Sequence, residues 1–158
     1  MLKTRRTWVE NNRDVINEHS RNWRERKRLA SECMQCGKAK PSVRQGEHKC
    51  EDCWFSDIAK STTGTRKNRD MVKNLFLSQG GRCAYTDEVL VAGQNASLDH
   101  KIPVSRGGDG SLSNLQWVTI KINSMKSDLT HKEFVALCTL ISMCPSDAKI
   151  GEPIPCLV

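Results

Sequence analysis

The sequence contains no apolar run near the roughly 20 residues that a membrane-spanning helix needs, so a bilayer is not an expected partner. Aromatic residues are scarce, at 5% of 158 residues, and hydrophobic residues make up only 37%. Such a chain buries modest cores, which favours one ordinary domain or two small modules. No internal repeat or low-complexity segment is visible, and the first residues lack the apolar segment of a signal peptide. We therefore expect a cytoplasmic location.

Acidic residues are outnumbered by basic ones, giving a formal net charge of +7 and an isoelectric point near 9.1. This excess favours a polyanionic partner. Residues 1–28 hold nine Lys or Arg against four Asp or Glu, and a second basic cluster lies between residues 60 and 73. A solvated helix face is the duller interpretation of such a run. The predicted DNA-contacting residues are Arg24, Arg26, Lys27, Arg28, Arg66, Lys67 and Arg69.

Cysteine is present in a pattern that favours a metal site. Cys33 and Cys36 form one Cys-x-x-Cys pair, Cys50 and Cys53 form another, and 13 residues separate the pairs. Two such pairs can close a tetrahedral zinc site. Disulfides or free thiols are the alternatives, but disulfides are rare inside cells. The sequence therefore predicts a structural Zn²⁺ bound by four cysteines in a compact knuckle or ribbon.

A second group of polar residues has the chemistry of phosphodiester hydrolysis. The imidazole of His100 is a suitable general base near neutral pH, because its ordinary pKa is about 6.5. The carboxylate of Asp99 and the carboxamide of Asn123 are oxygen ligands of the kind that Mg²⁺ prefers. Neighbouring residues of a strand face opposite sides, so Asp99 and His100 share a site only if the strand ends or turns there. Pro103 and the glycines at 107 and 108 provide that break.

The segment 113–126 has the apolar spacing of a helix, with Leu115, Val118, Ile122 and Met125 on one stripe. We predict one continuous helix, with Ser113 as its N-cap. Thr119, Asn123 and Lys126 would lie on the neighbouring stripe. A helix packed on a hairpin would then hold Asn123 beside Asp99.

These residues carry a resemblance. The run LDHKIPVSRGGDGSLSNLQWVTIKINSMK resembles the motif of the HNH endonucleases, and the similarity covers roughly residues 80–130. It implies a ββα-metal (His-Me finger) fold, with His100 as general base and Asp99 and Asn123 holding Mg²⁺ or Mn²⁺. It also implies that Asn114 braces the loop of the motif and that Lys126 faces the phosphate. Cleavage in such enzymes leaves 5′-phosphate and 3′-hydroxyl ends. A small free-standing protein of this build resembles phage or mobile-element enzymes, which places it in the host cytoplasm.

Many HNH domains are also clamped by zinc through two Cys-x-x-Cys knuckles, and this chain departs from that pattern. Only Cys83 of those ligands is present, because Thr86, Thr119 and Ile122 occupy the other three positions. We therefore expect the core of the motif to be zinc-free and held by packing. The residues expected to pack are Tyr85, Leu90, Leu98, Ile102, Leu115 and Val118.

The expected fold is a small α+β structure, in which a ββα-metal nuclease core is flanked by helices and preceded by a basic helix and the zinc knuckle. We place the basic helix and zinc module at residues 1–60, a linker at 61–67, the nuclease domain at 68–145 and a tail at 146–158. The basic helix covers residues 7–30, with Trp8, Val15, Ile16 and Trp23 near one face. Further helices are expected at 68–78 and from Thr130 onward, with Phe134, Leu137 and Ile141 inward, and short strands at 83–85 and 96–99.

The sequence thus predicts a metal-dependent endonuclease that hydrolyses double-stranded DNA, as a monomer or as a homodimer on DNA. Deleting residues 1–60 is expected to cost binding more than cleavage. Two alternatives stay open: a zinc-dependent DNA- or RNA-binding protein with a non-catalytic HNH fold, and an RNA-processing enzyme. The recognition sequence, nicking against double-strand cleavage, and a homing, restriction or packaging role are not determined by the sequence.

Overall fold

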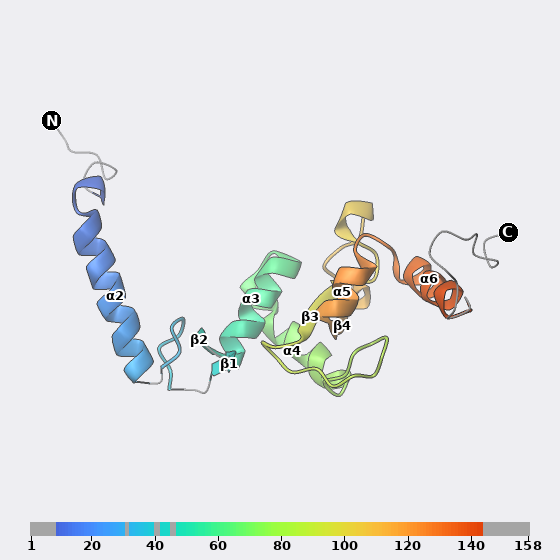
Figure 1. The fold of residues 1–158 in the computed structure, drawn as a ribbon, viewed down its shortest axis with the longest axis horizontal. Coiled ribbons are helices and arrows are strands. Elements are labelled where there is room, and N and C mark those ends of the chain that lie inside the picture. Colours follow the sequence, from blue (N-terminus) through green and yellow to red (C-terminus); the bar gives the residue numbers. More distant parts are fainter. Residues whose placement is uncertain (1–8, 31, 40–41, 45–46, 144–158) are drawn as a thin grey trace, which may run out of the picture.

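The computed structural model describes residues 9–30, 32–39, 42–44 and 47–143. Its helices and strands form an elongated molecule with α2 at one end and α6 at the other (Figure 1). In chain order the elements are α2 (Arg13–Leu29), β1 (Ser42–Arg44), β2 (Glu47–Cys50), α3 (Glu51–Thr63), η1 (Arg66–Asn68), α4 (Arg69–Ser78), β3 (Ala96–His100), η2 (Val104–Arg106), η3 (Leu112–Asn114), β4 (Leu115–Thr119), α5 (Ile120–Lys126) and α6 (His131–Met143). Helices and antiparallel strand pairs are combined, so the fold is small and α+β, as expected for an HNH core.

Helix α2 confirms the predicted basic helix over most of its length. Its half-buried positions include Ile16, Trp23 and Lys27, whose spacing defines one helical face. Val15 was expected on that face but is 65% exposed, and Trp8 lies outside the described residues. Because α2 extends away from the rest of the chain (Figure 1), most of its basic side chains remain open to solvent.

A tight turn at residues 32–39, here called the first knuckle, precedes a short antiparallel pair of strands, β1 and β2. Helix α3 begins directly after Cys50 and ends at Gly64, whose positive φ of 79° lets its N–H bond the carbonyl of Lys60. A left-handed residue at this position is typical of glycine. The segment expected to be a linker, residues 61–67, therefore contains the end of α3, its cap and the first two residues of η1.

The main core lies around Trp117 of β4, which is fully buried. Its ring centroid lies 5.6 Å from that of Trp54, 5.7 Å from that of Phe55 and 5.3 Å from that of Phe76. Its indole N–H donates to the carbonyl of Val72 at 3.1 Å. Helices α3 and α4 thus supply the residues that surround this one side chain.

The same core includes Phe55 and Ala59 of α3, which lie on the N-terminal side of the expected linker. A deletion ending at residue 60 would remove both and expose Trp117 to water. We therefore expect such a deletion to destabilise the core as well, and the relative loss of binding and of cleavage stays a prediction. The division into 1–60, 61–67, 68–145 and 146–158 stays a prediction, and its last segment lies outside the described residues.

The prediction of one helix over 113–126 is wrong. Leu115–Thr119 form strand β4, which pairs antiparallel with β3 from Ala96↔Thr119 to His100↔Leu115, and only Ile120–Lys126 are helical. All five residues of β4 are buried, since α4 contacts the strand pair and α5 packs against it as well. A strand buried throughout shows no alternation of apolar and polar residues. Its spacing was therefore mistaken for that of a helix.

Several smaller predictions are settled in the same way. Helix α4 and the N-terminus of α6 lie where expected, and Glu133 and Thr130 cap α6 reciprocally. Residues 83–85 form a turn rather than a strand, within the segment 82–89 that we call the second knuckle. Side chains expected inside but found exposed are Ile102, Leu137 and Ile141, at 48%, 43% and 61%. Among the described residues, no helix is both long and apolar enough to cross a membrane.

Candidate nuclease site and cysteine cluster

Four of the five residues predicted for catalysis or Mg²⁺ binding line one pocket of about 240 Å³, and Asn114 lies outside it. Asp99 and His100 reach it from the end of β3, while Asn123 and Lys126 reach it from α5. The rest of the lining is Leu98, Pro103, Val104 and Ser127. Because β3 ends at His100, the neighbouring side chains at 99 and 100 both line this pocket. The strand therefore ends directly after the Asp-His pair, as the sequence predicted.

The carboxylate of Asp99 is held from two sides. Its side chain is 5% exposed; Oδ1 accepts from the Lys126 ammonium at 3.0 Å and Oδ2 from the Gln116 amide at 2.9 Å. An ionised carboxylate offers about four lone pairs. Two positions on Asp99 are therefore available to a further donor or a cation.

Lys126 lies deeper than the sequence suggested. It is 1% exposed, and its ammonium also donates to the carbonyl of His100 at 2.7 Å. A buried charge is tolerated only when it is paired and hydrogen-bonded, and Asp99 fulfils that need. The ammonium expected to face the phosphate is instead bound to the Asp-His pair, so any catalytic role would act through those residues.

Asn114 braces the loop that follows His100. Its amide nitrogen donates to the carbonyls of Ile102 and Asp109, at 3.1 and 2.8 Å, and its amide oxygen accepts from the N–H of Ile102 at 2.8 Å. Gly108 makes this loop possible, because a Cβ there would lie 1.8 Å from the Ile102 carbonyl oxygen. The loop geometry agrees with the bracing role that the resemblance implies.

His100 and Asn123 complete the polar lining. Nε2 of His100 is buried and has no hydrogen-bond partner among the described residues. The amide nitrogen of Asn123 donates to Ser97 Oγ at 2.8 Å, which leaves its carbonyl oxygen as a ligand atom. One carboxylate, one carboxamide oxygen and one unpaired imidazole nitrogen around a small pocket fit a hard divalent cation and its bound water.

Comparison with known protein families agrees with this geometry. Residues 83–131 match the HNH endonuclease family model. The matched HNH segment runs from the second knuckle to the start of α6 and includes every residue of the polar pocket. It supports a nuclease-type function acting on nucleic acid. Comparisons with curated proteins and with solved structures gave no significant match.

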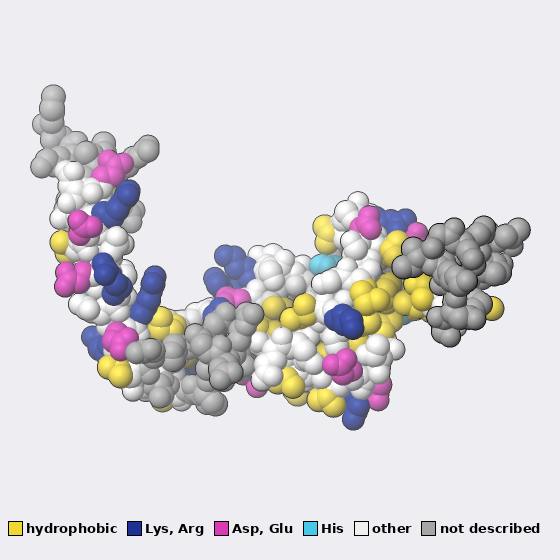
Figure 2. All heavy atoms as spheres, in the orientation of Figure 1, with side chains coloured by type: hydrophobic (Ala, Val, Ile, Leu, Met, Phe, Trp, Pro, Cys, Tyr) yellow, Lys and Arg dark blue, Asp and Glu magenta, His cyan; other side chains and the backbone are white. Residues whose placement is uncertain are grey.

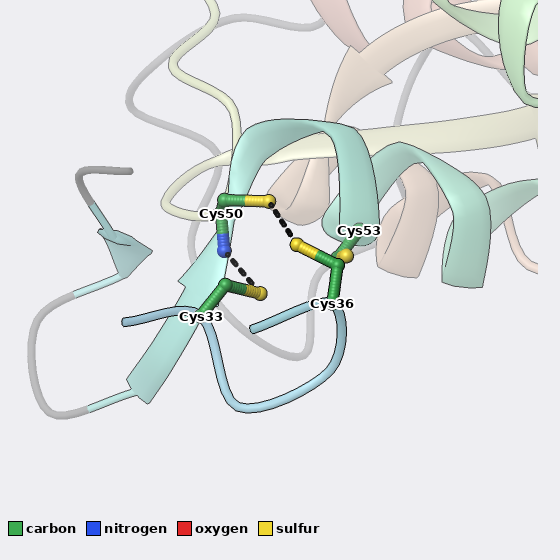
Figure 3. Close-up of side chains that lie close together, drawn as sticks. All are labelled: Cys33, Cys36, Cys50 and Cys53. Atoms are coloured by element: carbon green, nitrogen blue, oxygen red, sulfur yellow. Dashed lines mark hydrogen bonds between the residues drawn. The ribbon is translucent and has the colours of Figure 1, made fainter. Parts of the chain in front are cut away.

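The four cysteines predicted to bind zinc converge outside the HNH segment. Cys33 and Cys36 come from the first knuckle, Cys50 from the end of β2 and Cys53 from the first turn of α3 (Figure 3). Their sulfur atoms all lie within 4.8 Å of one another. This cluster can therefore hold a metal ion such as zinc.

Hydrogen bonds and burial act in opposite directions on these thiols. Burial disfavours the thiolate of Cys33, but backbone N–H groups, led by that of Cys50 at 3.3 Å, outweigh it and lower its pKa to about 6. Burial and the neighbouring thiols raise the pKa of Cys53. A bound cation would favour the thiolate form throughout the cluster.

Basic side chains lie along α2 and beside α3, and others lie on the body that contains the HNH segment (Figure 2). Three of the predicted DNA-contacting residues already pair with carboxylates: Lys27 with Glu32, Arg66 with Asp57 and Arg69 with Asp70. Arg24, Arg26 and Lys67 are exposed, while the side chain of Arg28 lies outside the described ones. Their contact with DNA stays a prediction.

Sequence reasoning missed three residues near the HNH pocket. Gln116 contacts Asp99 directly, and Tyr85 and His131 extend the contact outward. A glutamine two residues after the motif asparagine gives little signal by itself, because only strand pairing shows that it lies opposite Asp99.

Proposed function

We propose that this protein is a metal-dependent endonuclease that hydrolyses phosphodiester bonds of double-stranded DNA. The observation that carries the proposal is the single pocket lined by Asp99, His100 and Asn123 within the segment that matches the HNH family. The net charge of +7 suits a polyanionic substrate. Asp99 and Asn123 are the proposed ligands of Mg²⁺ or Mn²⁺, and the four cysteines the proposed ligands of a structural Zn²⁺.

In this proposal His100 acts as the general base. Its ring takes a proton from the attacking water, and its buried Nε2, which has no hydrogen-bond partner in the described part of the chain, is the nitrogen open to do so. The carboxylate of Asp99 is paired with Lys126 and keeps lone pairs available for a cation. The bound cation would supply charge stabilisation to the phosphorane and to the departing 3′ oxygen. Asn114 holds the loop of the base in place, and the products would carry 5′-phosphate and 3′-hydroxyl ends.

The test compares the full chain with His100→Ala on supercoiled plasmid, in Mg²⁺ and in EDTA. General-base removal typically costs about 10²- to 10⁴-fold in rate, so we expect nicking to fall by at least 10² and to vanish in EDTA. His19→Ala is the matched control, because His19 is an exposed histidine of α2. It should cut like the wild type.

Two outcomes would favour the alternatives. Metal-dependent cleavage of structured RNA but not of duplex DNA would indicate an RNA-processing enzyme. Tight DNA or RNA binding without cleavage of either by the wild type would indicate a zinc-dependent binding protein whose HNH fold is not catalytic.

A further inference from the structure

A continuous chain of hydrogen bonds leads from the pocket to the surface. Gln116 Nε2 donates to Asp99 Oδ2 at 2.9 Å and also lies 2.8 Å from the hydroxyl of Tyr85. That hydroxyl lies 2.9 Å from Nδ1 of His131. The four residues come from β3, β4, the second knuckle and the first turn of α6, so the chain ties all four segments together.

The direction of the two hydrogen bonds of Gln116 follows from the donors available. Its amide has two hydrogens, and Asp99 and Tyr85 accept one each. Between the tyrosine hydroxyl and Nδ1 of His131, the donor depends on which ring nitrogen carries the hydrogen. Both hydrogens of the Gln116 amide are used in either case.

The opposite orientation of Gln116 would be costly. Gln116 is 4% exposed and lies directly across the strand pair from Asp99. Rotating its amide would place a carbonyl oxygen against the buried Oδ2 of Asp99 and leave that oxygen without its donor, which is unfavourable. In the orientation of the structure, the hydroxyl of Tyr85 accepts the second hydrogen of the amide nitrogen.

The outer end of the chain is itself fixed. The backbone N–H of His131 donates to the carbonyl of Lys101 at 2.7 Å, next to the proposed base. The rings of Tyr85 and His131 are stacked, with their centroids 5.2 Å apart. The ring of Phe134 meets that of Tyr85 edge-on, also with the centroids 5.2 Å apart. Burial raises the pKa of Tyr85, which keeps its hydroxyl protonated and able to donate.

We propose that Gln116, Tyr85 and His131 are positioning residues that hold the Asp99 carboxylate in the orientation in which it binds the catalytic cation. This inference rests on the proposed function, since it takes Asp99 to be a ligand. Lys126 fixes one carboxylate oxygen and Gln116 the other, so together they set the plane of the group. Partners that orient a ligand in this way commonly contribute 10- to 100-fold to metal affinity.

The experiment measures Mn²⁺ binding to the zinc-loaded full chain by calorimetry and electron paramagnetic resonance, independently of cleavage. Tyr85→Phe removes the hydroxyl and keeps the ring contacts, so we expect affinity to fall several-fold. Gln116→Leu should lower it 10- to 100-fold. His131→Phe should have the smallest effect, because it lies farthest from Asp99.

Gln79→Leu is the matched control. Gln79 also bonds β4, through both the N–H and the carbonyl of Trp117, but does not contact Asp99. It should lower the melting temperature and leave Mn²⁺ affinity unchanged. An equal loss of affinity in Gln79→Leu, or wild-type affinity in both Tyr85→Phe and Gln116→Leu, would overturn the positioning role.

Asp99→Ala separates this inference from the proposed function. If the wild type binds Mn²⁺ and Asp99→Ala does not, Asp99 is a ligand. The variants of Gln116, Tyr85 and His131 then test the positioning role alone. If the wild type shows no Mn²⁺ binding that depends on Asp99, both the metal site and its positioning residues are overturned. Binding without any cleavage would contradict the nuclease proposal and leave the positioning result intact.

Discussion

The two knuckles have the same backbone turn, although only the first has a Cys-x-x-Cys pair. In the first, the N–H of Cys33 bonds the carbonyl of Lys38 and the N–H of Gly37 bonds that of Cys33. In the second, the N–H of Cys83 bonds the carbonyl of Glu88 and the N–H of Asp87 bonds that of Cys83. These distances are 2.9 and 3.0 Å, against 2.9 and 2.8 Å in the first knuckle. Each turn is closed by one bridge, Glu32↔Ala39 or Arg82↔Val89. The turn geometry is therefore independent of whether metal ligands are present.

The similarity continues beyond the turns. Each knuckle is followed by an antiparallel strand pair and then by a helix, α3 or α5. Cys50 and Thr119 are the N-caps of these helices, and each gives a backbone N–H to the first cysteine of its knuckle. The chain thus contains an internal structural repeat that the sequence did not show, contrary to expectation.

The two repeats hold the same arrangement of turn, strands and helix together in different ways. In the first, four thiols gather where a metal can join turn and helix. In the second, Thr86, Thr119 and Ile122 replace three thiols, and burial around Trp117 takes over the holding role. Tyr85, at the tip of the second knuckle, then bonds Gln116 beside the proposed active site. Gln35, at the matching tip, bonds Asp57 instead.

Metal removal should produce the largest difference between the knuckles. Structural zinc contributes on the order of 10 kcal/mol to folding in small zinc peptides. A chelator or Cys50→Ser should therefore unfold the first repeat, which consists of the first knuckle, β1, β2 and the start of α3. The melting temperature of the core should fall too, because α3 provides Phe55 and Ala59. Cys83→Ala should cost only about 1–2 kcal/mol. Thermal unfolding followed by tryptophan fluorescence measures each change.

The comparison would break if the chelator left the melting temperature unchanged. The first knuckle would then be held by packing, as the second is. Equal losses in Cys50→Ser and Cys83→Ala would lead to the same conclusion.

Restoring the missing thiols tests the repeat directly. The variant Thr86→Cys/Thr119→Cys/Ile122→Cys, with the native Cys83, should raise the zinc content from one to two ions per chain. The equivalent backbone positions of the two units are the reason. Elemental analysis and a chromophoric chelator give the count, and Thr86→Cys alone, with only two thiols, is the control. A triple variant that still holds one zinc would show that the second unit cannot form the site.

The smallest expected effect concerns the positive-φ position of each turn. Gly37 has a φ of 70°, and Asp87 has a φ of 57° at the matching position. Gly37→Ala should cost about 1 kcal/mol, since a Cβ is disfavoured there. Asp87→Gly should change stability by less than about 0.5 kcal/mol, because relief of backbone strain offsets loss of an exposed ion pair with Arg82. Urea unfolding of the zinc-loaded chain compares the two, and the reverse order would show that the turns are strained differently.

The site was more predictable from sequence than the fold around it. Asp99, His100, Asn114 and Asn123 have side chains whose chemistry defines a role, and their spacing is short enough to be seen directly. The four cysteines were predictable for the same reason, and their sulfur atoms do converge. The strand at 115–119 was not predictable, because burial on both faces hides its alternation of side chains.

The amino-acid sequence by itself determined which groups are available: two pairs of thiols, a carboxylate, an imidazole and two amides at fixed intervals. Only the tertiary structure decided how they are held. Lys126 reaches Asp99 across 27 positions, Tyr85 reaches His131 across 46, and Trp117 reaches Val72 across 45. Local patterns set chemistry and turn geometry, whereas contacts between distant segments depend on which buried surfaces pack together. No spacing of residues along the chain records that choice.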